Sequence, residues 1–248
     1  MMELKQYLDS TYLKTATQAE LTEAENLTVV NTIVDEAIQE QFKLVMIRPE
    51  MVKLAKEKIT TANVKVGVGT VIDFPEGRGA LQEKLQEAEK AIADGVDDLD
   101  FVVDYTSFKA GKIADVKEQV LACTKLGLAN DKIVKWIIEV AALNNQQIVR
   151  LSALIKNVVL SNFEEEHYQS VFVKSSTGFY KTTDGQSNGA TVPTIKLMLE
   201  NSFPLSVKAA GGVRTYEEAM QMITLGVKRI GTSSAKAIVS DGNASDGY

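Results

Sequence analysis

The sequence predicts an α/β fold and, within that class, a single (β/α)₈ barrel. Two observations lead to this prediction. Short β-rich runs alternate with longer amphipathic helical segments, a pattern that demands parallel strands joined by helical crossovers. The alternation also yields eight strands in 248 residues, which fits a closed barrel better than an open sheet. A doubly wound open sheet is the alternative if a strand has been miscounted.

The predicted strands are rich in β-branched and aromatic residues and end at polar or glycine-containing turns. In chain order they are Tyr7–Leu13, Leu44–Ile47, Lys65–Val71, Asp98–Val103, Ile133–Val140, Val171–Ser175, Ser206–Ala210 and Arg229–Gly231. A short N-terminal extension precedes the first strand, and the composition of residues 239–248 predicts a flexible C-terminal tail. No Pro-rich, Ser-rich or single-sign linker divides the chain, so residues 1–248 are expected to form one domain.

The predicted helices carry apolar residues at three- and four-residue spacing. They include Met51–Lys58, Leu81–Ala93, Ile113–Leu126, Ile148–Val159, Val192–Leu199 and Tyr216–Leu225. Thr191 is placed to cap one helix, with Pro193 in its first turn. Thr215 and Glu218 form a capping box for another. These signals fix where two crossovers begin.

Composition excludes several classes of function. The net charge of −6 disfavours a nucleic-acid surface, which needs clustered Lys and Arg. No apolar run approaches the roughly 18 residues of a membrane span, and Met1–Leu8 lacks the apolar stretch of a signal peptide, so a cytoplasmic location is expected. One cysteine and one histidine cannot supply a usual zinc site. We expect Cys123 to be a buried, inert thiol and His167 to lie on the surface.

Ionisable residues interrupt strands that should be apolar in a barrel. Lys174 and Lys208 each end a β-rich run and precede a glycine-containing loop, which places both at the C-terminal rim where barrel enzymes have their active sites. Lys135 and Glu139 would share one face of the fifth strand. The fourth strand carries Asp98, Asp100 and Asp104, of which Asp98 and Asp104 could equally be solvated at strand ends.

A lysine pair at the rim has a recognisable chemistry. Partial desolvation and a neighbouring cation lower the pKa of an amine from about 10.4 toward neutrality, and a neutral amine attacks carbonyl carbon. Lys174 would be the nucleophile and Lys208 the cation that lowers its pKa. Asp100 is the carboxylate best placed to move protons.

Polar and glycine-rich loops follow strands six, seven and eight, where barrels commonly bind phosphate through backbone N–H groups. They are Ser176-Thr177-Gly178, Gly211-Gly212-Val213-Arg214 and Gly231-Thr232-Ser233-Ser234. Three such loops on adjacent strands predict a phosphorylated substrate.

These loops and lysines resemble those of the deoxyribose-phosphate aldolases. The resemblance covers nearly the whole chain and also includes Tyr7–Thr11, Val71–Gly77, Asp97–Asp100 and a terminal Tyr248. It implies a class I aldolase that forms a Schiff base and reversibly cleaves 2-deoxyribose 5-phosphate to acetaldehyde and glyceraldehyde 3-phosphate, with no metal or organic cofactor. It also implies that the partners are these small molecules, and it favours a homodimer.

The resemblance assigns roles to individual residues. Lys174 would form the Schiff base, Lys208 would lower its pKa, Asp100 would relay protons, and Asp9 would order the network beside Lys208. The residues expected around the phosphate are Gly178, Gly211, Gly212, Arg214, Gly231, Ser233 and Ser234.

Two positions need separate comment. The resemblance suggests that the tail folds over the site and offers the Tyr248 hydroxyl to the proton moved at the nucleophilic carbon. Where other family members have a lysine after Thr-Gly, this chain has Phe179, which removes one charge from the phosphate site unless Arg214 or Lys181 compensates.

Two other functions are alternatives. Another lysine-dependent aldolase or transaldolase would share the imine but use a different donor. A sugar-phosphate isomerase barrel would share the phosphate loops but use carboxylates without an imine. The paired lysines argue against the isomerase, because carboxylate chemistry has no use for two neighbouring amines.

Overall fold

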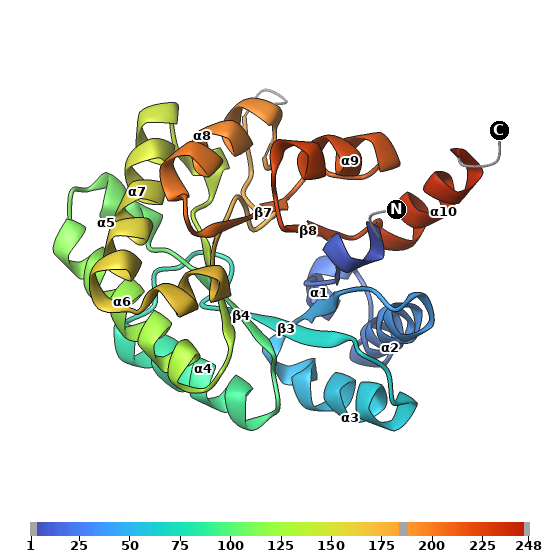
Figure 1. Cartoon of the computed structure of the whole chain (residues 1–248). Coiled ribbons are helices and arrows are strands. Elements are labelled where there is room, and N and C mark those ends of the chain that lie inside the picture. Colours follow the sequence, from blue (N-terminus) through green and yellow to red (C-terminus); the bar gives the residue numbers. More distant parts are fainter. Residues whose placement is uncertain (1–3, 184–187, 246–248) are drawn as a thin grey trace.

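Eight parallel strands form the closed barrel that the sequence predicts (Figure 1). A computed structural model describes residues 4–183 and 188–245. Each strand pairs with the next, and β8 pairs with β1 to close the sheet. The strands are β1 (Leu8–Thr11), β2 (Leu44–Ile47), β3 (Gly67–Ile72), β4 (Asp98–Val102), β5 (Ile133–Ile137), β6 (Val171–Lys174), β7 (Ser206–Ala210) and β8 (Arg229–Thr232).

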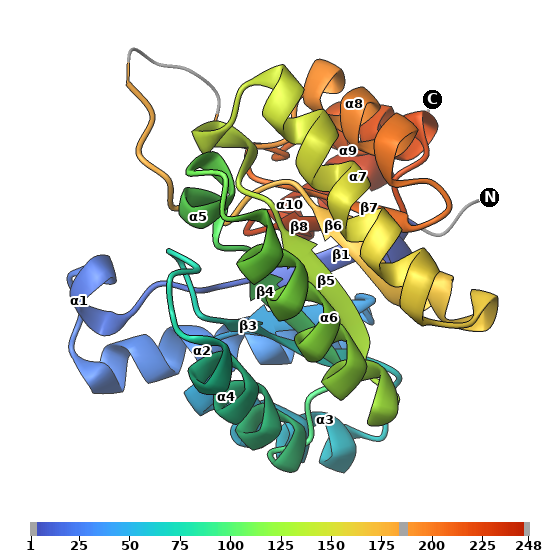
Figure 2. The ribbon, with the colours of Figure 1, turned by 90° about the vertical axis from the view of Figure 1, so that its left-hand side faces the viewer.

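Helices lie around the outside of the strands (Figures 1 and 2). They are α1 (Ala16–Ala19), α2 (Glu23–Glu40), α3 (Val52–Ala62), α4 (Leu81–Ala93), α5 (Tyr105–Lys109), α6 (Ile113–Ala129), α7 (Asn145–Asn162), α8 (Val192–Ser202), α9 (Tyr216–Leu225) and α10 (Ala235–Ser245). The predicted caps are confirmed: the side chains of Thr191 and Thr215 accept hydrogen bonds from Thr194 and Glu218. Thr22 and Glu25 form a capping box that starts α2, a helix absent from the prediction.

The two-residue period of each strand separates two environments. One set of side chains, such as Phe101, Trp136 and Val173, belongs to the large core shared with the helices. The alternate set points into the barrel. On β2 and β3 this set is apolar, as with Met46 and Val71, whereas each of β4 to β8 contributes at least one buried charged side chain to it. The barrel interior therefore has an apolar side and a charged side.

Two strand predictions were too long by three residues each. β1 ends at Thr11, and β5 ends at Ile137, so Lys135 and Glu139 do not share a strand face. Glu139 has a φ of 54°, in the left-handed region, and this conformation turns the chain out of the barrel. The Asp104 side chain caps α5 by accepting a hydrogen bond from Ser107 N–H at 2.8 Å, so this aspartate belongs to a helix and not to β4.

The ends of the chain differ from the prediction in one respect. Helix α10 continues to Ser245, so residues 239–245 of the predicted tail belong to a helix, and the flexibility of the tail stays a prediction. Its apolar residues Ile238 and Val239 are buried, which the polar composition of the segment obscured. Residues 246–248, and with them Tyr248, lie outside the described residues. The N-terminal extension includes a 3₁₀ turn at Leu4–Tyr7.

Within residues 4–183 and 188–245, no helix combines the length and the hydropathy that crossing a bilayer requires.

Candidate active site

Strand register brings the two predicted lysines together inside the barrel. Lys174 on β6 and Lys208 on β7 are direct partners in the parallel ladder, and both side chains are buried. Their ammonium groups contact the same oxygen of Asp100, Lys174 Nζ at 2.8 Å and Lys208 Nζ at 3.0 Å from Oδ2. Asp100, on β4, reaches them across the barrel because a closed sheet points these strands at a common centre. The structure thus assembles three residues that the sequence singled out.

Four more acidic or basic side chains surround this centre. Lys135 Nζ lies 2.8 Å from Asp100 Oδ1 and 2.6 Å from Asp98 Oδ2. Asp9 Oδ2 lies 2.6 Å from Lys208 Nζ, as expected for a residue that orders the network. Arg229 Nη2 joins the two outer carboxylates, at 2.6 Å from Asp9 Oδ1 and 3.0 Å from Asp98 Oδ2. We call these residues the charged cluster: Lys135, Lys174, Lys208, Arg229, Asp9, Asp98 and Asp100.

The charged cluster contains four basic and three acidic groups, so full ionisation leaves one excess positive charge. Lys174 is the basic group that most readily loses its proton and so removes this excess charge. Burial, which disfavours the ammonium form, lowers its pKa to about 8, and the charge of Lys208 adds to the effect against the attraction of Asp100. Burial opposes the charge of Lys208 too, but Asp100 and Asp9 outweigh it and raise the Lys208 pKa.

Two carboxylates of the cluster, Asp100 and Asp9, stay ionised. Burial alone would raise the pKa of Asp100, yet Lys135, Lys174 and Lys208 together hold it well below its ordinary value. The pKa of Asp9 is likewise lowered, because the charges of Arg229 and Lys208 overcome its burial. A neutral amine beside an ionised carboxylate is the arrangement needed for a nucleophile with a proton relay.

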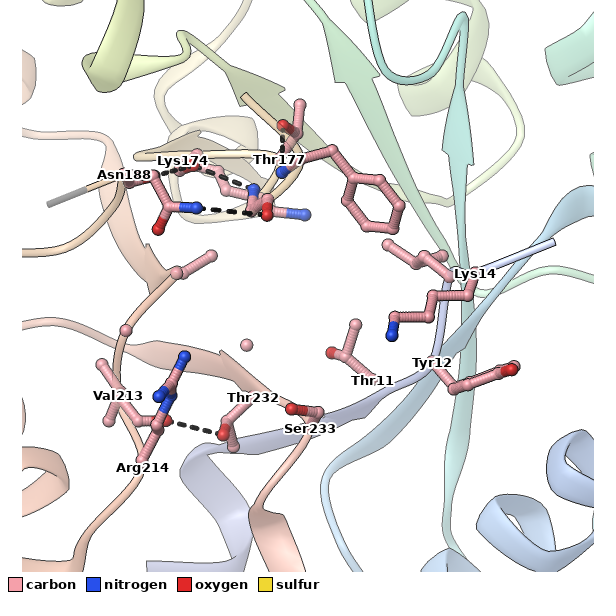
Figure 3. Close-up of a pocket in the computed structure, with 18 residues that line it drawn as sticks. Thr11, Tyr12, Lys14, Lys174, Thr177, Asn188, Val213, Arg214, Thr232 and Ser233 are labelled. Atoms are coloured by element: carbon pink, nitrogen blue, oxygen red, sulfur yellow. Dashed lines mark hydrogen bonds between the residues drawn. The ribbon is translucent and has the colours of Figure 1, made fainter. Parts of the chain in front are cut away.

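A pocket of about 330 Å³ opens above Lys174 at the C-terminal ends of the strands (Figure 3). Its size suits a small ligand. Most of the residues predicted to surround a phosphate line it: Gly178, Gly211, Gly212, Arg214, Gly231 and Ser233. Ser234 does not, and its backbone N–H instead donates to Thr232 Oγ1 at 3.0 Å. Six of the seven residues therefore line this pocket, and their contact with a phosphate stays a prediction.

Three of the pocket glycines have a clear steric reason. Gly211 and Gly212 have φ values of 84° and 90°, which side chains rarely adopt, so the loop after β7 can expose its backbone to the pocket. At Gly231, a Cβ atom would lie 3.0 Å from Lys208 Cε. The absence of a side chain at Gly231 therefore makes room for the buried side chain of Lys208.

Two cations reach the pocket from different loops. Figure 3 shows the Lys14 amine, from the segment after β1, and the Arg214 guanidinium, from the loop after β7, directed into the same space. Lys181 lines a separate hollow with Glu76 and Arg78. Phe179 packs edge-on against Phe74, with ring centroids 5.0 Å apart, and makes one wall apolar.

Comparison with known proteins decides which kind of barrel this is. The model of the DeoC/LacD family aldolases matches residues 6–241. This chain belongs to the DeoC/LacD aldolase family. It is 37% identical to the deoxyribose-phosphate aldolase of Thermococcus gammatolerans over 240 residues, 96% of both proteins. It is 34% identical to that of Mycoplasmopsis pulmonis over 248 residues, which is 100% of both.

Solved structures place this aldolase among the same proteins. An aldolase called QR15 superposes with a TM-score of 0.79 at 28% identity, covering 99% of this chain and 98% of its own. The deoxyribose phosphate aldolase of Aeropyrum pernix, described as a unique tetramer, gives 0.76 at 25% identity over 97% of this chain and 91% of its own.

Sequence reasoning missed several residues of this aldolase's site. Lys135 and Asp98 were noted as anomalies without a role, although their two-residue spacing from other inward positions was a usable signal. Arg229 was overlooked because its strand is short and the arginine stands at its beginning. Lys14 follows a strand that was drawn too long, which hid its place at the rim.

Two minor predictions for this aldolase are confirmed. Cys123 is fully buried, and burial raises the pKa of its thiol to about 12, so it is inert at neutral pH. His167 lies at the surface with 40% of its side chain exposed.

Proposed function

We propose that this chain is a deoxyribose-phosphate aldolase that cleaves 2-deoxy-D-ribose 5-phosphate reversibly to acetaldehyde and D-glyceraldehyde 3-phosphate. One observation carries the proposal: Lys174 is a buried amine with a pKa of about 8 that lines the pocket and contacts an ionised carboxylate. A lysine in that state forms imines with aldehydes at physiological pH. The deoxyribose-phosphate aldolases among its relatives support this choice of substrate.

The chain's residues account for each step. Neutral Lys174 adds to the C1 aldehyde of the open-chain sugar, and loss of water gives an iminium ion. Removal of the proton from the C3 hydroxyl breaks the C2–C3 bond, releases glyceraldehyde 3-phosphate and leaves an enamine. Protonation at C2 and hydrolysis by water then free acetaldehyde and restore Lys174. Asp100 touches Lys174 and is the group we assign to the proton transfers at the carbinolamine.

The neighbouring groups help to keep Lys174 in its neutral, reactive form. Lys208 stays protonated, so its charge disfavours a second ammonium on Lys174. Asp9 holds Lys208 in place at 2.6 Å and is assigned that ordering role. Tyr248 lies outside the described residues, and its role in proton transfer at C2 remains our prediction. Deleting Tyr248 should slow both turnover and exchange of the acetaldehyde methyl protons, and unchanged values would exclude it.

The far end of the pocket suits the phosphate. Backbone N–H groups of glycine loops and the cations Lys14 and Arg214 surround the same space, and such groups are the usual partners of phosphate oxygens. Lys14 thus supplies a positive charge for the phosphate in place of the lysine that Phe179 replaces in this chain.

Imine trapping tests the proposed function directly. Sodium borohydride added with acetaldehyde should reduce the imine to a stable ethyl group on Lys174, and peptide mapping locates it. The same mixture with EDTA should label equally, because no step in the proposal uses a metal. Label on another lysine would contradict the assignment, and labelling by a ketone donor but not by acetaldehyde would favour a different lysine-dependent aldolase.

The pH dependence of cleavage follows from the amine. The Lys174 pKa lies below its ordinary value, at about 8, so the reactive neutral form increases as pH rises toward that value. At pH 7 roughly one amine in ten is neutral, and kcat/KM should rise nearly tenfold per pH unit below it. A profile of kcat/KM from pH 5.5 to 9 checks this. A profile that is flat below pH 8 would exclude Lys174 as the titrating nucleophile.

Replacing Lys14 should weaken phosphate binding. In Lys14→Ala we expect KM for 2-deoxyribose 5-phosphate to rise about tenfold, the loss of one charge-assisted contact, while cleavage of unphosphorylated 2-deoxyribose is unchanged. Lys181→Ala is the matched control, because Lys181 lines a different hollow. Steady-state kinetics with both sugars decide the matter. Equal effects of Lys14→Ala on both sugars would refute a phosphate contact.

The remaining features of the proposal concern the protein's setting. Small aldehydes and sugar phosphates are its partners, and we propose the cytoplasm as its location, since charged sugar phosphates do not cross membranes unaided. We propose a homodimer as its assembly, to be measured by analytical ultracentrifugation; the Aeropyrum pernix relative is described as a tetramer.

A further inference from the structure

Glu139 is a buried acidic residue beside the active site for which the mechanism above has no use. It lies two residues beyond the end of β5, and only 1% of it is exposed. Its left-handed backbone turns its side chain toward the loop after β6, which carries Ser176, Thr177 and the pocket-lining Gly178. Thr177 donates to Glu139 Oε2 from its backbone N–H, at 3.1 Å, and from its hydroxyl. The carboxyl group therefore bridges two neighbouring strand ends.

The hydrogens around Ser176 show which ionisation state this contact needs. Ser176 Oγ lies 2.6 Å from the carbonyl oxygen of Asn188 and 2.9 Å from Glu139 Oε1. It also accepts a hydrogen bond from Gly178 N–H at 2.9 Å. A serine hydroxyl has one proton, and a backbone carbonyl has none to give. The serine proton must therefore go to Asn188, and the contact with Glu139 lacks a proton unless the carboxyl group supplies it.

We propose that Glu139 is a positioning residue held as a neutral carboxylic acid, which donates its proton to Ser176 and thereby fixes the substrate-binding loop after β6. In this state Ser176 Oγ donates once and accepts twice, which uses its full capacity. An ionised Glu139 would instead turn an oxygen with no proton toward a serine lone pair between two buried side chains, and that arrangement is costly.

The charges and burial around Glu139 agree with a protonated carboxyl group. Burial raises the pKa of Glu139, and the rise persists against the hydrogen bonds from Thr177, the charge of Lys174 on β6 and even a Ser176 hydroxyl taken as a donor. Tyr105 on α5 also faces this carboxyl group; its own pKa is raised to about 12, mainly by burial, so it is neutral at physiological pH. Among residues 4–183 and 188–245, Lys174 is thus the charged group with the largest effect on the Glu139 pKa, and it becomes neutral when reactive.

A neutral Glu139 also explains how a carboxyl group can lie so near the nucleophile. A carboxylate there would favour the ammonium form of Lys174 and so raise the pKa that the charged cluster lowers. The acid form provides the hydrogen bonds that hold the loop without that opposing charge. Above the Glu139 pKa the proton is lost, the Ser176 contact breaks, and the loop that carries Gly178 is released, so activity should decline at alkaline pH.

Two variants separate the acid from the carboxylate. In Glu139→Gln the amide N–H donates to Ser176 and the amide oxygen accepts from Thr177, so we expect kcat and KM within about threefold of wild type at pH 7 and a weaker alkaline decline. Glu139→Leu keeps the volume without hydrogen bonds, and KM should rise about tenfold or more through loss of loop position. If the glutamine variant were as impaired as the leucine variant, an ionised carboxylate would be required and the proposal would fail.

A spectroscopic measurement detects the proton on Glu139 independently of enzyme activity. Carbon-13 NMR of protein labelled at glutamate side-chain carboxyl carbons, titrated from pH 5 to 9, should contain one resonance that stays at the protonated position through pH 7 and is missing from Glu139→Gln. A Glu139 resonance at the ionised position at pH 6 overturns the inference, even if the leucine variant fails to fold. The kinetic role of Glu139 rests on the proposed function, but the NMR measurement does not. If the wild-type protein had no aldolase activity, the proposed function would be wrong and the NMR result would still show whether Glu139 carries a proton.

Discussion

Lys174→Met should abolish cleavage of 2-deoxyribose 5-phosphate without loss of stability. Methionine matches the length of lysine but cannot form an imine, so kcat/KM should fall by about 10⁴-fold or more. The fold disfavours the ammonium form of Lys174, as its lowered pKa records, and Asp100 keeps Lys135 and Lys208 as partners. The free energy of unfolding at pH 7 should therefore stay within about 1 kcal/mol of wild type or increase. Chemical denaturation and steady-state kinetics measure the two quantities.

The control for this variant is Lys196→Met on the exposed face of α8. It carries the same substitution outside the site and should change neither activity nor stability. Residual cleavage in Lys174→Met above about one per cent of wild type would mean that the imine forms on another amine.

Asp100→Asn should lose activity too but, unlike Lys174→Met, it should also lose much of the free energy of unfolding. The carboxylate of Asp100 contacts three ammonium groups, and an amide of the same shape leaves Lys135, Lys174 and Lys208 without their shared counter-charge. Removing one partner from a buried ionic network costs roughly 3–5 kcal/mol. We expect that loss in urea unfolding at pH 7, with a smaller loss at pH 9, where Lys174 is neutral.

Asp104→Asn is the matched control four residues further along the chain. Asp104 caps α5, and asparagine caps a helix equally well, so unfolding should change by less than about 1 kcal/mol. Equal destabilisation by the two substitutions would show that Asp100 is not the centre of the network.

Periodicity was enough to predict the barrel, because its strands must be apolar on the outside whatever they carry inside. The eight strands were found in the right order, and their ends were the weak point. β5 was extended through Glu139, since a run of apolar residues looks the same in a strand and in the turn that follows it. Helix α10 was missed because its buried residues, Ile238 and Val239, are few among polar ones.

The candidate site was predictable where charge interrupts an apolar strand just before a glycine loop, as at Lys174 and Lys208. It was not predictable where closure of the barrel creates the contact. Nothing local in the sequence of Arg229 indicates that it bridges Asp9 and Asp98, because that pairing depends on which strands face each other across the interior. The proton on Glu139 likewise depends on three segments that meet only in the folded chain.

The pairing of Arg229 with Asp9 joins residues 220 positions apart, and it has a consequence during synthesis. A growing chain produces Asp9 early and Arg229 late, so Asp9 and Asp98 can pair with Lys208 and Lys135 before β8 has left the ribosome but cannot be joined to each other until then. We expect a chain truncated before β8 to be less stable than the full chain, because it lacks both this arginine and the strand that closes the barrel.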